Sequence, residues 1–166
     1  MVEDKKLTEH YSLYDLTKTT HLDLQDQNRI LIEEQVVKAG VLALLVEEAR
    51  MILDVPVIVS SAYRCPELNK RVGSTVRSQH LLFEAADCVP KGMAVDEAFR
   101  KIRQAIKDHK IKVGQLIYEK TNGREGLTEW LHVSLGHPYR ERGRCNQILT
   151  MNQGTYTLIE TIAQNA

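Results

Sequence analysis

The sequence predicts one α+β domain, in which helices pack on one side of a mainly antiparallel sheet. Apolar residues recur with helical spacing in the first third of the chain, and short β-branched runs follow later. Helices therefore come first and strands afterwards, with one helical crossover, an order typical of α+β domains. The 166 residues amount to about one domain, and no repeat, low-complexity tract or Pro/Gly/Ser-rich linker divides residues 1–166.

The N-terminal third is expected to be an ordered arm followed by helix. Residues 1–25 form the arm. Its anchors are Tyr11, Leu13, Tyr14 and Leu16. Asp26 is placed to cap a helix that begins near Gln27. Apolar residues keep roughly helical spacing over residues 30–46, and Gly40 is expected to break this segment into two helices.

The remaining two thirds are expected to form most of the sheet. Predicted strands cover residues 57–59, 85–89, 113–118 and 130–135, and residues 148–150 and 156–159 form a last hairpin. A short helix is expected at residues 66–71. An amphipathic helix is predicted at residues 94–109, with Ala98, Ile102, Ala105 and Ile106 on one face.

Charge and hydropathy exclude several classes of function. The chain has 22 Lys plus Arg and 22 Asp plus Glu, which argues against a broad basic face for nucleic acid or an anionic membrane. No apolar run is long enough to span a membrane, and residues 1–7 are charged and lack the apolar core of a secretory signal. We expect a monomer that is made in the cytoplasm without a signal peptide and is released by another route if its substrate lies outside.

The cysteines and the C-terminal arginines predict no site of their own. The chain has an odd number of cysteines, Cys65, Cys88 and Cys145, and no Cys-x-x-Cys pair. Neither a disulfide framework nor a thiolate zinc knuckle is therefore expected. The basic stretch Arg140, Arg142 and Arg144 is interpreted as a solvated loop.

One group of residues has the composition of a catalytic metal site. Such a zinc site takes three protein ligands from His and carboxylate and keeps one position open for water. His80, Asp87 seven residues later, and His132 supply two imidazoles and one carboxylate. Water on such an ion has a pKa of about 7, which makes a hydroxide nucleophile available at neutral pH.

Two charged residues are candidates for the accompanying chemistry. Glu129 lies three residues before His132, and its carboxylate can reach the metal if that segment is bent or lies at a strand edge. There it would act as general base and acid. Arg64 is a planar, permanently charged donor that suits a substrate carboxylate or a developing oxyanion. Taken singly, a histidine is more often structural, and His10, His21, His109 and His137 are interpreted so; Trp130 is expected in the core.

The order of these pieces resembles a known family. Ser61-Ala-Tyr-Arg-Cys-Pro-Glu-Leu-Asn-Lys70, Ser78-Gln-His-Leu81, Glu84-Ala-Ala-Asp87 and Trp130-Leu-His-Val-Ser134 are similar to segments of the zinc D-alanyl-D-alanine peptidases, which share the hedgehog/D,D-peptidase fold. The segments Tyr11–Leu16, Gln115–Tyr118 and Arg144–Leu149 look like the same family. The resemblance therefore covers almost the whole chain.

The resemblance implies a zinc metallopeptidase that cuts peptidoglycan stem peptides or D-Ala-containing peptides derived from them. It implies that His80, Asp87 and His132 hold Zn²⁺, that Glu129 is the general base, and that Arg64 steadies the substrate or the oxyanion. Ser78 is implied as a substrate contact or a support of the metal ligands. The bond cut is that of a D,D-carboxypeptidase, a D,D-dipeptidase or an L-alanyl-D-glutamate endopeptidase.

One departure from the family pattern concerns the segment between the first two ligands. Family members usually carry a small residue, commonly glycine, at the position of Phe83, and a small polar residue at that of Leu82. A bulky Phe83 beside the pocket would reshape or narrow the substrate site. The alternative to an enzyme is therefore a weak or inactive module on the same fold, which binds peptidoglycan or serves as a phage structural part. An intact Glu129 favours the enzyme, and a pocket filled by Phe83 would favour the binder.

Overall fold

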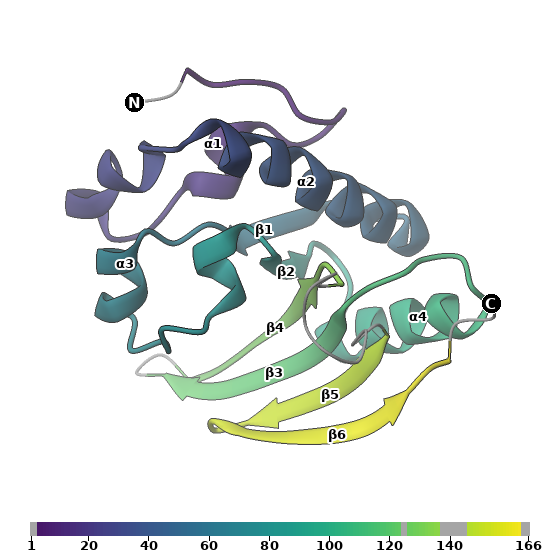
Figure 1. Cartoon of the computed structure of the whole chain (residues 1–166). Coiled ribbons are helices and arrows are strands. Elements are labelled where there is room, and N and C mark those ends of the chain that lie inside the picture. The colour runs from purple at the N-terminus through teal and green to yellow at the C-terminus, as the bar shows by residue number, and fades with distance from the viewer. Residues whose placement is uncertain (1–2, 124–125, 137–145, 164–166) are drawn as a thin grey trace.

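The protein is described here by a computed structural model, which covers residues 3–123, 126–136 and 146–163. Its centre is a six-stranded sheet in the order β1-β2-β4-β3-β5-β6 (Figure 1). The strands are β1 Val57–Ser61, β2 Ala85–Pro90, β3 Gln115–Gly123, β4 Gly126–Ser134, β5 Gln147–Asn152 and β6 Thr155–Thr161. Every neighbouring pair is antiparallel except β3 and β5, which are parallel.

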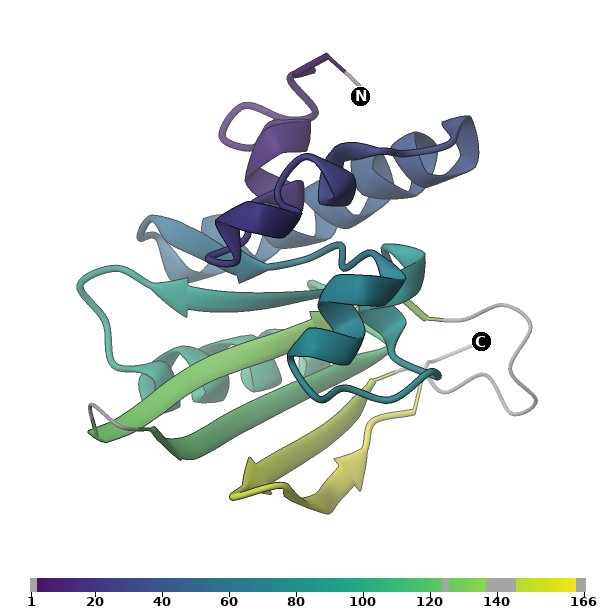
Figure 2. The ribbon, with the colours of Figure 1, turned by 90° about the vertical axis from the view of Figure 1, so that its left-hand side faces the viewer.

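The two long helices cover one face of the sheet, as expected for this α+β fold. They are α2 Glu33–Leu53 and α4 Val95–Lys107, which contact each other as well as the sheet. The short helix α3 Pro66–Arg71 and the 3₁₀ turn η3 Gln79–Leu82 lie on the opposite face from α4 (Figure 2). The sheet therefore has a helix-covered face and a second face, which α3, η3 and the loop between them partly cover.

Alternation along the central strands separates a core from this second face. Leu131 and Val133 of β4 are buried in the core, as are Leu116 and Tyr118 of β3. Residues between them point the other way, because successive side chains of a strand alternate across the sheet. The second face thus receives the even-numbered residues of β4 and the odd-numbered residues of β3.

The N-terminal arm contains more helix than the sequence pattern indicates. Residues Leu13–Thr17 form α1, which Ser12 caps by accepting a hydrogen bond from the Asp15 N–H, while the Asp15 carboxylate accepts one from the Ser12 N–H. Tyr11, Leu13 and Leu16 are buried, as expected of anchors, whereas Tyr14 is only partly buried. The phenol of Tyr11 donates a hydrogen bond to the Val57 carbonyl at 2.9 Å, which ties the arm to β1.

Two expectations about the long helix were wrong. Asp26 precedes only a 3₁₀ turn, η2 Gln27–Arg29, and its side chain caps nothing there, whereas α2 begins at Glu33. Helix α2 also runs through Gly40 without a break. A single helical glycine costs about 1 kcal/mol relative to alanine, and packing against the sheet offsets that cost over 21 residues.

The other predicted elements are present, although β3 continues to Gly123 and β4 already begins at Gly126. Helix α3 has the expected bounds, and β5 and β6 form the predicted hairpin. Cys65 and Cys88 are buried free thiols, whereas Cys145 and the arginines at 140, 142 and 144 lie outside the described residues. Across the parts of the chain that the structure covers, no helix is both long and apolar enough to cross a membrane.

Candidate metal centre and catalytic cleft

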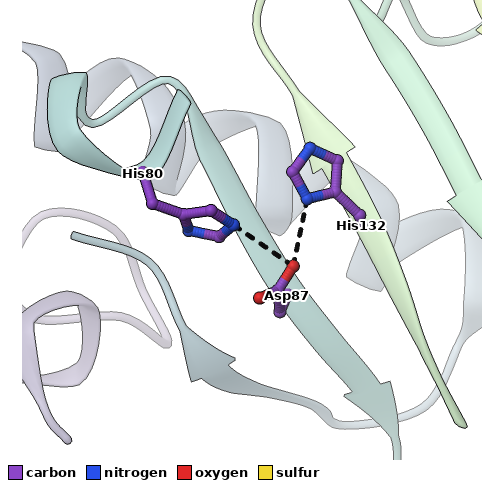
Figure 3. Close-up of side chains that lie close together, drawn as sticks. All are labelled: His80, Asp87 and His132. Atoms are coloured by element: carbon purple, nitrogen blue, oxygen red, sulfur yellow. Dashed lines mark hydrogen bonds and ion pairs between the residues drawn. The ribbon is translucent and has the colours of Figure 1, made fainter. Parts of the chain in front are cut away.

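Three side chains converge on the second face of the sheet. Nε2 of His80 lies 3.4 Å from Oδ1 of Asp87, and Nδ1 of His132 lies 3.0 Å from the same oxygen (Figure 3). All three residues are buried, and their ligand atoms lie within 4.8 Å of one another. The structure therefore brings together the three metal ligands expected from the sequence.

Local structure explains this convergence. Asp87 on β2 and His132 on β4 are register partners in an antiparallel pair, so their side chains stand side by side on one face. His80 lies in η3, where the Ser78 hydroxyl accepts a hydrogen bond from the His80 N–H at 3.3 Å. Ser78 thus caps the turn that carries the first ligand, and it also lines the cavity described below.

The outer nitrogen of each histidine has a hydrogen-bond acceptor. Nδ1 of His80 lies 2.7 Å from the Ala62 carbonyl oxygen, and Nε2 of His132 lies 3.0 Å from Oε1 of Gln79. In a neutral imidazole one nitrogen donates and the other offers a lone pair. In this tautomer the inner nitrogens turn lone pairs toward Asp87, and such a set is satisfied by a cation between the three groups, either a metal ion or a proton held on an imidazole. This donor set fits zinc, whose histidine ligands usually make such outer hydrogen bonds.

Arg64 supports the carboxylate ligand from outside. Its Nη2 lies 2.7 Å from Oδ2 of Asp87, its Nε donates to the Ser61 hydroxyl at 2.9 Å, and its backbone N–H donates to the His80 carbonyl at 3.1 Å. Burial alone would raise the pKa of Asp87, but the adjacent His80 and His132 hold that pKa well below its usual range. Asp87 is therefore ionised, and Arg64 engages the carboxylate oxygen opposite the two imidazoles.

A cavity of about 730 Å³ opens beside the three ligands, a size typical of ligand pockets. Residues 72–75 and 77–79, which follow α3 and lead into η3, form a mostly polar wall. Ile117 of β3 and Trp130 of β4 lie on its floor, so the expectation that Trp130 belongs to the core was wrong. Leu149, Met151 and Tyr156 extend the lining onto β5 and β6. A peptide can therefore lie along this side of the sheet and reach the metal ligands.

Glu119 is a second acidic residue, besides Asp87, that lines this cavity. It is register partner of Trp130, it is 6 % exposed, and its Oε1 lies 3.9 Å from Nδ1 of His132. Burial raises the pKa of Glu119 to about 7, and Asp87 adds to this effect, while His132 and Arg64 oppose it. A carboxylate in this position and with this pKa is suited to accept and return a proton near neutral pH.

Glu129 does not reach the site, and its expected position beside the ligands was wrong. Strand β4 is regular and lies inside the sheet, so residues three apart point to opposite faces. The Glu129 carboxylate accepts a hydrogen bond from the phenol of Tyr118, whose ring packs against Phe99 of α4, and it lies 3.7 Å from Lys120 Nζ. Glu129 is thus on the helix side of the sheet, whereas His132 is on the cavity side.

Phe83 does not narrow the cavity, contrary to expectation. Its side chain is fully buried, and its ring stacks on Tyr63 with centroids 4.7 Å apart. Phe83 ends η3 with a φ of 56°, in the left-handed region that favours glycine. The bulky residue is therefore accommodated in the core, whereas Leu82 is 41 % exposed.

A signal in the sequence could have identified Glu119. The segment Gln115–Tyr118 was predicted to be a strand, and the next residue is a charged one on the face opposite Leu116 and Tyr118. The same alternation, applied to the strand predicted at residues 130–135, would have separated Glu129 from His132.

Comparison with known proteins gives one family. A family model described as Peptidase M15 matches residues 9–134, which include the arm from residue 9, all three candidate ligands and Glu119. A search of curated proteins gave no match.

Proposed function

Because this chain belongs to the peptidase M15 family, and is thus a metal-dependent peptidase, we propose that it is a zinc peptidase that hydrolyses peptidoglycan stem peptides or D-Ala-containing peptides derived from them. The observation that carries the proposal is the convergence of His80, Asp87 and His132 beside Glu119 in one cavity. Two imidazoles and one carboxylate would hold a zinc ion and leave a position open for water, as in catalytic zinc sites.

We assign the ligand atoms from the hydrogen bonds around them. His80 binds through Nε2 and His132 through Nδ1, because their other nitrogens donate to Ala62 and Gln79. Asp87 binds through Oδ1, since Arg64 holds Oδ2. A zinc ion held there would supply a water of lowered pKa and would polarise the peptide carbonyl.

In our proposal Glu119 moves the proton. Its carboxylate accepts a proton from the attacking water and returns it to the leaving amine, as a general base and then a general acid. Burial raises the pKa of Glu119 in the metal-free protein, and the charge of a bound zinc ion would lower that pKa again, which favours the ionised form that accepts the proton. Arg64 acts chiefly by fixing Asp87, because its Nε and one Nη already have partners.

An inactive binding or phage structural module is not favoured. A cavity filled by Phe83 would favour such a module, but that ring is buried against Tyr63 instead. The cavity keeps an acidic residue beside the ligands, which a module that only binds would not need.

Mass spectrometry of purified muropeptides after incubation with zinc-loaded protein tests the proposal. We expect close to one zinc per chain and cleavage at one bond of the stem peptide. His132→Ala should lose both the metal and the cleavage, since removing one of three ligands typically abolishes tight binding. Stoichiometric zinc without cleavage of any stem peptide would contradict the substrate class, and absence of zinc binding would contradict the metal site.

A further inference from the structure

The outer wall of the cavity lies outside the matched family region. The match ends at residue 134, whereas β5 and β6 span residues 147–161. Leu149 and Met151 of β5 and Tyr156 of β6 all line the cavity. The family match therefore says nothing about the role of Tyr156, which has to be argued from the structure.

Strand register places Tyr156 in line with Glu119. Glu119 on β3 pairs with Met151 on β5, and Met151 pairs with Tyr156 on β6. Two strand spacings of about 4.8 Å thus separate the backbones of Glu119 and Tyr156. Both side chains line the same cavity, with Met151 between them in the register.

The electrostatic surroundings of the phenol agree with this placement. Burial raises the pKa of Tyr156, and the charges of Glu119 and Asp87 raise it further, while Arg64 lowers it. The charges that shift the pKa of this hydroxyl are therefore the same three that surround the candidate metal site.

The Tyr156 hydroxyl has no hydrogen bond to another described residue. The hydroxyls of Tyr11 and Tyr118, in contrast, donate to the Val57 carbonyl and to Glu129. The Tyr156 side chain is 57 % exposed at the open edge of the cavity. Its O–H group is thus able to donate to a bound molecule without breaking a protein contact.

We propose that Tyr156 is a further catalytic residue, whose hydroxyl donates a hydrogen bond to the carbonyl oxygen of the scissile peptide as negative charge develops there. This inference rests on the proposed peptidase function. Such a donor would act beside the polarising effect of a bound zinc ion, and Arg64 is less suited to this role because Asp87 and Ser61 already engage it. Donors aimed at a developing oxyanion stabilise the transition state more than the ground state.

Tyr156→Phe tests the proposal, because it removes only the hydroxyl. We expect kcat on a muropeptide that the wild type cleaves to fall about 10- to 100-fold, the value of a hydrogen bond to a charged group. KM and zinc content should stay the same. The Kd of a phosphinate dipeptide isostere, which mimics the charged transition state, should rise by a similar factor. Affinity for the intact peptide is measured in the Glu119→Gln background, which is expected to cleave slowly. There the peptide should bind the single variant and the double variant with Tyr156→Phe equally well. The matched control is Thr157→Val, since Thr157 is the next, exposed residue of β6 and points to the other face.

Three results would overturn the inference. A raised KM with unchanged kcat would show that the tyrosine contacts only the ground-state peptide. Unchanged kcat and unchanged phosphinate affinity would remove it from the site. A wild-type protein that cleaves no stem peptide would refute the proposed function itself. Failure of the tyrosine proposal is distinguishable from this, because the first two results can be observed only with an active wild type.

Discussion

Replacing Glu119 and Glu129 one at a time by glutamine separates the two candidates for the general base. Glutamine keeps the size of the side chain but cannot accept a proton. For Glu119→Gln we expect kcat to fall by about 10²–10⁴, the usual contribution of a positioned base, with zinc content unchanged. Glu129→Gln should leave kcat close to the wild-type value, because this carboxylate lies on the helix side of the sheet with Tyr118 and Lys120.

The same substitution should have a calculable effect on stability in the metal-free protein. Burial, partly opposed by His132, raises the pKa of Glu119 from 4.5 to about 7. At about 1.4 kcal/mol per pKa unit, this difference corresponds to about 3 kcal/mol.

The sign follows from which state holds the proton. Below pH 4.5 the carboxyl is protonated in both the folded and the unfolded chain, so it causes no loss of stability. Between 4.5 and about 7 the unfolded chain ionises while the folded protein keeps its proton, so the free energy of unfolding falls as pH rises and stays reduced above 7. Glu119→Gln should therefore unfold like the wild type near about pH 4 and be more stable by about 3 kcal/mol near about pH 8.

Two measurements check this reasoning. Mass spectrometry of stem-peptide cleavage gives kcat for the zinc-loaded proteins, and urea unfolding of chelator-treated proteins gives stability at the two pH values. A fully active Glu119→Gln, or activity lost only in Glu129→Gln, would refute the assignment of the base. A stabilisation that does not change with pH would refute the assignment of the buried carboxylate as its cause.

Three further substitutions probe the surroundings of the metal. Gln79→Ala removes the acceptor for Nε2 of His132 and should weaken zinc binding by about 10- to 100-fold; chelator competition measures this, and unchanged affinity would show that the hydrogen bond is dispensable. Arg64→Lys keeps the charge but cannot reproduce the planar contact with Asp87, so turnover should fall, and full activity would remove Arg64 from the mechanism. Phe83→Gly relieves about 1 kcal/mol of left-handed backbone strain but loses a buried ring worth about 3–5 kcal/mol. It should therefore destabilise the protein in urea unfolding without changing the substrate profile, and a broadened profile would show that the ring does border the cavity.

The sequence predicted those parts of the fold in which one pattern dominates. The β-branched run at residues 57–59 and the amphipathic segment at 94–109 became β1 and α4, because burial on one face leaves a regular trace in the sequence. The predicted break at Gly40 is wrong, because the low helix propensity of one glycine is outweighed by the packing of a long helix.

The candidate site likewise contains residues that the sequence predicts and residues that it does not. The three ligands could be predicted because metal chemistry fixes residue types, and the family pattern fixes their order. Glu129 is close to His132 along the chain, but closeness in the folded protein depends on strand pairing, which brings Glu119 of the neighbouring strand beside His132 instead. Phe83 could not be placed, because the left-handed turn that directs its ring into the core is a backbone property with no periodic signal.

The pairing of β3 with β4 also determines where this chain can change in length. Tyr118 and Glu119 are neighbours that face opposite sides of the sheet, one toward Phe99 and the other toward His132. Deleting or inserting one residue within β3 would exchange their faces, which would bury a carboxylate among apolar side chains and put a phenol beside the metal ligands. Gain and loss of residues is therefore compatible with the site only in the connections between strands, and alignments of related chains should place their gaps there.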